Sequence, residues 1–303
     1  MVGKPIDTVC VVGAGFMGQQ IALQSAVHGL NVSMYDISTE ALQRAPLALK
    51  TMLDQLASQK QFSAEDKERI LTLVRPTRDA AEAARNAGLV IENAPENAEV
   101  KREILAKFDN LCPADTILST NSSAIRASSL EDATKRPDKV LNLHFYSPVW
   151  SRPMVELMGG TATSEDTLNR VKQFARCIGL LPLMVMKEST GFIFNRIWHA
   201  IKMESMTVVD TGVASHQDVD RAWMIATGMP IGPFGLMDMI GLDVIRDVAM
   251  VYYRETQYEK DRPPGLLTDM IERGELGVKT SRGFYDYPNP EFQERGFLKA
   301  SGG

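Results

Sequence analysis

The sequence predicts an α/β fold in which a doubly wound, mostly parallel sheet is followed by a second, all-helical domain. Three observations lead to this prediction. Short apolar, strand-like runs alternate with helical stretches up to Lys187. A glycine-rich turn follows the first of these runs, and beyond Lys187 helical stretches dominate. We therefore expect a sheet domain over residues 1–187 and a helical domain over residues 188–303.

The first elements form one βαβ unit. Asp7–Val12 is a short apolar run that ends in glycines, which is typical of a strand buried on both faces of a parallel sheet. A helical stretch follows over 18–27, and a second strand is predicted over 30–36. The unit takes about thirty residues, which is the length that a parallel crossover needs.

The alternation then continues through the rest of the first domain. Helices are predicted over 39–60, 63–73, 97–110 and 164–177, and strands over 89–92, 116–119, 140–145, 154–157 and 181–186. The helix at 63–73 opens with Ser63 and Asp66, which together make a capping box. In the second domain we expect helices over 191–210, from Ser215, over 233–253 and over 266–273, with one strand-like run at 284–287.

Composition and charge exclude several classes of protein. Hydrophobic residues at 44% and charged residues at 23% are the globular average, which excludes a disordered or fibrous chain. A net charge of −5 without a basic stripe predicts no nucleic-acid partner. Cys10, Cys112 and Cys177 are scattered, which favours a reducing compartment and offers no paired metal ligands. The chain shows no signal sequence or long apolar run, so we expect a cytoplasmic protein without membrane contact and without a metal site.

A dinucleotide-binding loop is predicted after the first strand. Gly13-Ala14-Gly15-Phe16-Met17-Gly18 fits the pattern G-x-G-x-x-G, whose glycines permit a tight turn, close approach of a pyrophosphate and packing of helix on strand. Asp36 ends the second strand at the position of a ribose-binding acid, and no Arg follows it directly. These features predict NAD as cofactor in preference to NADP. The structural alternative is a glycine turn beside a solvated Asp36.

His144 is the candidate acid/base. It ends a predicted strand, at the sheet edge where ligands of open α/β sheets bind. Glu156 follows in the next strand-like run, where its carboxylate can hold one ring nitrogen of His144 and so orient the imidazole as a base. The structural alternative is a histidine that only makes a hydrogen bond within the sheet.

These motifs, in this order, resemble those of the L-3-hydroxyacyl-CoA dehydrogenase family over nearly the whole chain. The segments that carry the resemblance are Gly13–Gly18, Glu96–Lys101, Ser119–Ser123, His144-Phe145 with Pro148, Met154–Glu156, Gly191–Ile193 with Asn195-Arg196, Gly232–Phe234, and Lys279-Thr280 with Gly283–Tyr285. The resemblance implies reversible hydride transfer between NAD and a 3-hydroxyacyl-CoA in fatty-acid or short-chain acyl metabolism. It also implies a homodimer formed through the helical domain.

The resemblance further assigns roles to residues. His144 would be the acid/base, paired with Glu156, and Ser123 and Asn195 would bind the reacting oxygen of the substrate. Glu96, Lys101, Ser147 and Lys279 match family positions near the cofactor, and Ser123 is counted with them. For Ser123 and Asn195 the structural alternative is a bond to nearby backbone groups.

Departures from the family pattern concern the substrate. Ser147 stands where many relatives have Asn, Gly235 where they have Glu, and Ser281 where they have Gly. The helical pair after the second strand carries few of the lysines that CoA-binding members place there; its basic residues are Lys50, Lys60, Lys67, Arg44 and Arg69. Three hypotheses therefore stand: a 3-hydroxyacyl-CoA dehydrogenase, a dehydrogenase of a non-CoA hydroxy compound, and an NAD-binding protein without turnover.

Overall fold

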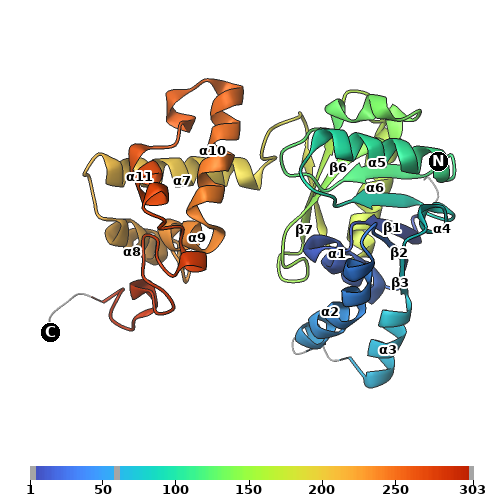
Figure 1. Cartoon of the computed structure of the whole chain (residues 1–303), viewed down its shortest axis with the longest axis horizontal. Coiled ribbons are helices and arrows are strands. Elements are labelled where there is room, and N and C mark those ends of the chain that lie inside the picture. Colours follow the sequence, from blue (N-terminus) through green and yellow to red (C-terminus); the bar gives the residue numbers. More distant parts are fainter. Residues whose placement is uncertain (1–4, 58–61, 300–303) are drawn as a thin grey trace. The chain divides into compact units, whose positions relative to one another are not determined.

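The chain divides into two compact units, Met1–Ile193 and Phe194–Gly303 (Figure 1). The computed structural model describes residues 5–57 and 62–299, so the end of the helix predicted at 39–60 lies outside the described residues. The division between the units falls beyond Lys187 because the following residues pack on the first unit. For example, the main-chain N–H of Ile193 donates to Glu156 over 3.0 Å.

An eight-stranded sheet in the order β3-β2-β1-β4-β5-β6-β7-β8 forms the centre of the first unit. Its strands are β1 (Thr8–Val12), β2 (Asn31–Tyr35), β3 (Val74–Thr77), β4 (Leu89–Glu92), β5 (Ile117–Thr120), β6 (Val140–Phe145), β7 (Met154–Gly159) and β8 (Leu181–Val185). Neighbouring strands are parallel except β6 and β7, which are antiparallel. The order from β3 to β6 is that of a Rossmann fold, so the predicted fold class is confirmed.

Helices cover both faces of this sheet. They are α1 (Phe16–Val27), α2 (Thr39–Ala57), α3 (Ala64–Thr72), α4 (Ala80–Ala84), α5 (Ala98–Leu111) and α6 (Glu165–Cys177), with short 3₁₀ helices η1 (Ala127–Ser129), η2 (Glu131–Ala133) and η3 (Pro137–Lys139). In β1, Val9 packs in one apolar cluster with Ile21 of α1, whereas Cys10 packs in another with Phe108 of α5. Successive residues of a strand point to opposite faces, so β1 is buried on both, as its composition predicts.

The sequence pattern does not predict β3 and α4. β3 has four residues, includes Arg75 and Pro76, and pairs only with β2 at the edge of the sheet. Such an edge strand needs no continuous apolar run. α4 has five residues and depends on the Asp79 carboxylate, which accepts from the N–H groups of Ala81 (2.8 Å) and Glu82 (3.2 Å). Both elements are too short for a periodic signal.

The second unit is built from helices. They are α7 (Phe194–Asp210), α8 (His216–Thr227), α9 (Pro233–Ile240), α10 (Leu242–Thr256) and α11 (Gly265–Glu272), with short 3₁₀ helices η4 (Glu259–Asp261), η5 (Val278–Thr280) and η6 (Glu291–Gln293). The predicted helix at 233–253 is two helices, because Gly241 at φ +104° ends the first. Likewise α7 begins at Phe194 and not at Gly191, because Gly191 and Phe192 have positive φ angles of 73° and 55°.

Two buried carboxylates organise the end of the second unit. Asp238 accepts from the N–H groups of Phe284 (3.0 Å) and Tyr285 (2.9 Å), so the strand predicted at 284–287 is wrong: these amides bond to a side chain and not to a neighbouring strand. Asp220 accepts from the N–H groups of Phe234 (2.9 Å) and Gly235 (3.0 Å). Burial raises the pKa of both carboxyl groups.

No helix formed by residues 5–57 and 62–299 combines the length and the hydropathy that a membrane span requires.

Candidate active site

His144 and Glu156 lie directly opposite each other on the antiparallel strands β6 and β7. Nδ1 of His144 is 3.2 Å from Oε2 of Glu156. Both side chains are buried: His144 is 6% exposed and Glu156 is fully buried. Because residues directly opposite on antiparallel strands point to the same face of a sheet, the strand register alone brings the predicted pair together.

Glu156 also accepts hydrogen bonds that the sequence analysis does not predict. The hydroxyl of Tyr146 donates to Oε2 over 2.6 Å, and the main-chain N–H of Ile193 donates to Oε1 over 3.0 Å. A fully buried carboxylate is costly unless hydrogen bonds satisfy it, and here both of its oxygens have donors. These donors help to fix the carboxylate that orients His144.

Two aromatic rings enclose the imidazole of His144. The ring of Phe192 stacks on it, with centroids 4.8 Å apart and an interplanar angle of 21°. The ring of Tyr146 meets it edge to face at 4.7 Å and 69°. The left-handed backbone at Phe192 presents this ring to the end of the sheet. The rings and Glu156 together restrict His144 to one orientation.

The glycine loop has the close approaches that its pattern predicts. A side chain at Gly13 would bring its Cβ to 2.9 Å from the carbonyl oxygen of Asn93, and one at Gly18 would lie 1.9 Å from the carbonyl oxygen of Gly13. A Cβ at Gly15 would meet nothing within 4 Å in the described chain. Glycine is therefore needed at Gly13 and Gly18 for packing, whereas the main chain at Gly15 is open to a ligand.

The start of α1 is suited to a phosphate. Among the described residues no side chain caps its N-terminus at Gly15, and its first turn holds no acidic residue. Uncapped N–H groups at the end of a helix bind phosphate groups, aided by the helix dipole. In this turn Phe16 is 65% exposed and Met17 is half-buried. The loop therefore fits the pyrophosphate of a dinucleotide.

Asp36 is joined to this loop by hydrogen bonds. Its Oδ2 accepts from the N–H of Ala14 over 2.7 Å, and its Oδ1 accepts from the N–H of Ser38 over 2.8 Å. The carboxylate is half-buried and still has lone pairs for a ribose hydroxyl. Its negative charge beside the loop disfavours a ribose that carries a 2′-phosphate. The residues present thus fit NAD.

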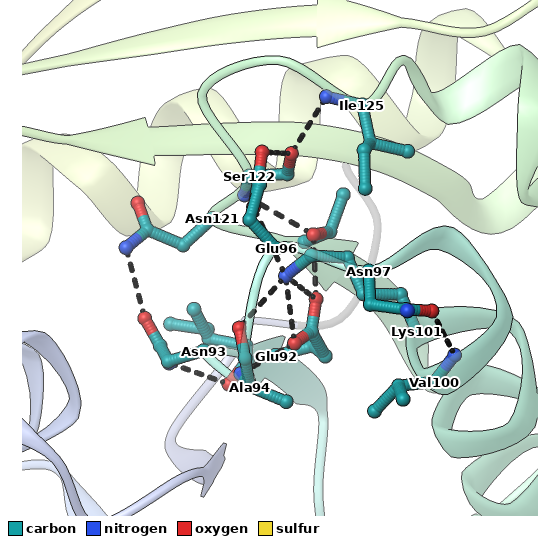
Figure 2. Close-up of polar contacts among 12 residues, drawn as sticks. Glu92, Asn93, Ala94, Glu96, Asn97, Val100, Lys101, Asn121, Ser122 and Ile125 are labelled. Carbon is teal, nitrogen blue, oxygen red and sulfur yellow. Dashed lines mark hydrogen bonds and ion pairs between the residues drawn. The ribbon is translucent and has the colours of Figure 1, made fainter. Parts of the chain in front are cut away.

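Glu96 and Lys101 belong to a polar network at the ends of β4 and β5 (Figure 2). The ammonium group of Lys101 lies 2.9 Å and 3.0 Å from the two carboxylate oxygens of Glu92, 3.1 Å from the carbonyl oxygen of Ala94 and 3.5 Å from Glu96. Lys101 and Glu92 are almost completely buried, and Thr120 also donates to Glu92. Lys101 therefore helps to hold the turn after β4 in place from the interior of the first unit.

Ser122 and Ser123 lie in different environments. Ser122 is buried, donates to the Glu96 carboxylate and accepts from the N–H of Ile125 over 2.7 Å. Ser123 is exposed. The Ser122–Glu96 bond connects the turns after β4 and β5, and Ser123 extends from the second of them. The sequence pattern alone does not distinguish the two hydroxyl groups.

Asn121 is a residue that the sequence analysis missed. Its amide nitrogen donates to the side-chain oxygen of Asn93 over 2.9 Å (Figure 2). Its own oxygen accepts from the N–H of Phe145 over 2.8 Å. The ends of β4, β5 and β6 are therefore joined next to His144. Asparagine directly after a strand at this edge was the available signal.

Ser147 contacts α1. Its hydroxyl accepts from the amide of Gln20 over 3.1 Å, and the same amide's oxygen accepts from the N–H of Val149 over 3.1 Å. Gln20 thus fixes the turn between β6 and β7. Ser147 lies in this turn, two residues after the last residue of β6. The Ser147 hydroxyl still has a lone pair to offer, and it lies beside α1, the helix that follows the glycine loop.

Asn195 and Lys279 belong to the second unit. Asn195 is half-buried in the first turn of α7. Lys279 lies on η5 and forms an ion pair with Asp243 of α10. Within the described residues, no group of three or more His, Cys, Asp or Glu side chains could hold a metal ion.

The basic residues of α2 and α3 are partly engaged by acids. Lys67 is 2.7 Å from Asp54, and Arg69 is 3.3 Å from Asp66. Arg44 and Lys50 are exposed, and Lys60 lies outside the described residues. The charge available for an anionic group on this helical pair is therefore small.

Comparisons with known proteins identify the family of the chain. A family model described as 3-hydroxyacyl-CoA dehydrogenase, NAD binding domain, matches residues 8–189, and one described as 3-hydroxyacyl-CoA dehydrogenase, C-terminal domain, matches residues 191–287. The chain is 34% identical to a 3-hydroxybutyryl-CoA dehydrogenase of Clostridioides difficile, over 92% of this chain and 99% of the relative. It is also 31% identical to a 5-formyl-3-hydroxy-2-methylpyridine 4-carboxylate 5-dehydrogenase of Mesorhizobium japonicum, over 93% of this chain and 91% of the relative.

Solved structures give the same result. The (S)-3-hydroxybutyryl-CoA dehydrogenase of Ralstonia eutropha superposes with a TM-score of 0.89 at 37% identity, covering 94% of this chain and 100% of that one. A diketoreductase superposes with a TM-score of 0.82 at 34% identity, covering 94% and 100%. Since both family models match and several relatives align over nearly their full length, the chain belongs to the 3-hydroxyacyl-CoA dehydrogenase family, and its first unit is the NAD-binding domain of that family.

Proposed function

We propose that this chain catalyses the reversible, NAD-dependent oxidation of an L-3-hydroxyacyl-CoA to the 3-ketoacyl-CoA. The observation that carries the proposal is the buried pair of His144 and Glu156 at the carboxyl end of β6, in a unit whose glycine loop fits NAD. Relatives named 3-hydroxybutyryl-CoA dehydrogenase support a short acyl chain. Fatty-acid or short-chain acyl metabolism is the corresponding setting.

His144 serves as the acid/base in this proposal. With Nδ1 bonded to Glu156, the ring takes the tautomer in which Nδ1 carries the hydrogen and Nε2 keeps its lone pair. Nε2 then accepts the proton of the substrate hydroxyl, and the imidazolium that forms is stabilised by Glu156. In the reverse direction His144 returns this proton to the forming alkoxide.

The remaining predicted residues bind and orient the reactants. The dinucleotide would be held by Asp36 and by the glycine loop Gly13–Gly18, which includes Ala14, Phe16 and Met17. Its surroundings would be completed by Glu96, Lys101, Ser123, Ser147 and Lys279. NAD, when bound, accepts a hydride from the carbon that carries the hydroxyl. Ser123 and Asn195 would donate hydrogen bonds to the reacting oxygen.

One activity assay separates the three hypotheses. Purified protein is mixed with NAD and L-3-hydroxybutyryl-CoA, then with free 3-hydroxybutyrate, and NADH absorbance is followed. Turnover of the CoA ester supports the proposal, and turnover of the free acid alone would move the substrate to the non-CoA class. Measurable NADH binding without turnover of either compound would contradict an enzymatic function.

We further propose that residues 1–187 bind NAD and that residues 188–303 close on the substrate and form a homodimer contact. Support for the contact comes from large apolar side chains that the second unit leaves more than half exposed, among them Ile197, Ile225 and Met239. Light scattering coupled to gel filtration should give twice the mass of the chain.

The three free cysteines are compatible with a reducing cytoplasm, which we propose as the location.

A further inference from the structure

A polar hollow of about 270 Å³ lies in the first unit, where the sheet meets the short helix α4. It is lined by residues of β2 and β3, which include Ser33 and Arg75, and by Arg85 and Asn86, which directly follow α4. Among the described residues that line it, none is assigned to the cofactor or to the acid/base pair. A water molecule takes about 30 Å³ in the liquid, so the hollow has room for a small molecule.

The strand register explains why the wall of this hollow is polar. Ser33 is aligned with Cys10 of β1 on one side and with Arg75 of β3 on the other, so all three point to the same face of the sheet. Toward the middle of the sheet this face is covered by α5, where Cys10 packs in one cluster with Phe108. At the corner it meets only α4, whose five residues leave the first residues of β2 and β3 exposed to the hollow. The faces of a parallel sheet are usually apolar and covered, so this corner departs from the pattern.

Several polar side chains of the hollow have no partner in the chain. In the part of the chain that the structure describes, no hydrogen bond or ion pair is made by the side chains of Ser33, Arg75, Arg85 and Asn86. The acidic side chain among the described lining residues is Glu82, which accepts from the hydroxyl of Thr77 over 2.5 Å. Two guanidinium groups therefore face one carboxylate, and the hollow is positive although the whole chain carries a net charge of −5.

We propose that this hollow binds a small polyvalent anion whose carboxylate or phosphate groups are held by Arg75 and Arg85. A guanidinium group presents a planar set of N–H donors that fits the oxygens of either kind of group. The Ser33 hydroxyl and the Asn86 amide can bind further oxygens of the same ligand. Because β3 pairs only with β2, a ligand that also contacts the end of α4 stabilises this corner of the folded chain.

Binding is measured without turnover, by isothermal titration calorimetry on the purified full-length chain. Inorganic phosphate and citrate are the two probes, and chloride at equal ionic strength is the reference. NADH is present throughout, because the glycine loop is itself suited to phosphate. We expect saturable binding of at least one probe: binding of phosphate alone assigns a phosphate ester, and binding of citrate alone assigns a polycarboxylate. Absence of saturable binding of both probes would overturn the proposal.

Charge-removing variants locate the site. Arg75→Gln and Arg85→Gln should each weaken binding by at least about tenfold, the scale of a lost hydrogen bond between charged groups. The matched control is Arg78→Gln, which removes an exposed arginine that follows β3 and does not line the hollow. The control should leave the affinity unchanged. Equal weakening in all three variants would attribute binding to the general surface charge and overturn the site.

A fourth variant should bind the anion more tightly, which a damaged fold cannot imitate. Glu82→Gln removes the carboxylate charge from the hollow and keeps an oxygen that can accept from Thr77. We expect the affinity for the anion to rise roughly twofold or more, the scale of one interaction between exposed charges. An affinity that stays constant or falls in Glu82→Gln would contradict an anion bound in this hollow.

Discussion

The ammonium group of Lys101 lies 2.9 Å from Oε2 of Glu92 in an ion pair that is almost inaccessible to solvent. α5 supplies the lysine, and β4 supplies the glutamate. The pair is completed by Thr120 of β5, which donates to Glu92, and by the carbonyl oxygen of Ala94, which accepts from Lys101 (Figure 2). It therefore joins a helix and two strands directly beneath the turns that carry Glu96 and Ser123.

Breaking this pair on one side should destabilise the first unit strongly. Lys101→Met leaves the Glu92 carboxylate buried without its counter-charge, which typically costs about 3–5 kcal/mol. Unfolding by urea, followed by circular dichroism, measures the change. Lys67→Met removes an exposed pair with Asp54 and should cost at most about 1 kcal/mol. Equal losses in the two variants would show that burial of the Lys101 pair does not matter.

Removing the imidazole should abolish most catalysis without removing the cofactor. His144→Gln is expected to lower kcat by at least about a hundredfold, the scale of a lost general base, while the affinity for NADH stays nearly constant. Turnover is measured with the CoA ester, and NADH affinity is measured by fluorescence titration. Turnover at the wild-type level in this variant would require another residue to be the acid/base.

Asp36 should control the choice between NAD and NADP. Asp36→Ser removes the carboxylate charge that disfavours a 2′-phosphate and keeps a short hydrogen-bonding side chain. We expect the ratio of kcat/KM for NAD to that for NADP to fall by at least about tenfold, which corresponds to roughly 1.4 kcal/mol. Glu103→Gln, which changes an exposed acid on α5, is the control and should leave the ratio unchanged. An unaltered ratio in Asp36→Ser would place cofactor selection elsewhere.

Lys202 should make stability depend on pH. It lies on α7, is 5% exposed, and has no carboxylate within 4 Å among the described residues; its ammonium lies over the ring of Trp198. Burial lowers the pKa of Lys202 from 10.5 to about 8. The stability that this group contributes is thus fully present above its unfolded pKa and is lost as pH falls through about 8.

Lys202→Met should therefore stabilise the protein at pH 7 and not at high pH. A pKa lowered from 10.5 to about 8 corresponds to a gain on the order of 3 kcal/mol at pH 7. The gain should disappear above the ordinary pKa of lysine, near 10.4. Urea unfolding at several pH values measures this, and Lys50→Met on the exposed side of α2 is the control. A gain that is independent of pH would attribute the effect to packing alone.

The sequence predicts those parts of the molecule that local patterns determine. β1 is apolar throughout because both of its faces are covered, and Gly13 and Gly18 are glycines because the backbone of Asn93 and of Gly13 itself leaves no room for a Cβ. The meeting of His144 and Glu156 could be predicted because the two residues lie close to the turn that joins consecutive strands, His144 before it and Glu156 after it. β3 and α4 could not be predicted, since neither is long enough to show a period.

Contacts that arise only in three dimensions were not predictable. The pattern around Lys101 is that of an ordinary helix, and its burial follows from Glu92, which approaches from another element. Tyr146 follows a strand like any aromatic residue, and only the turn after β6 directs its hydroxyl to Glu156. The donor from Ile193 is a main-chain group that any residue type could supply.

The antiparallel pairing of β6 and β7 limits how this protein can change in evolution. Side chains on a strand alternate between faces, so a shift of one residue between the two strands would place Val155 or Leu157 opposite His144 and turn Glu156 to the other face. A single insertion or deletion inside either strand, between the turn and this pair, is then as damaging as replacement of the acid itself. Evolution should therefore preserve this register, and in the joining loop it should preserve the side chains that make contacts, Tyr146 with Glu156 and Ser147 with Gln20.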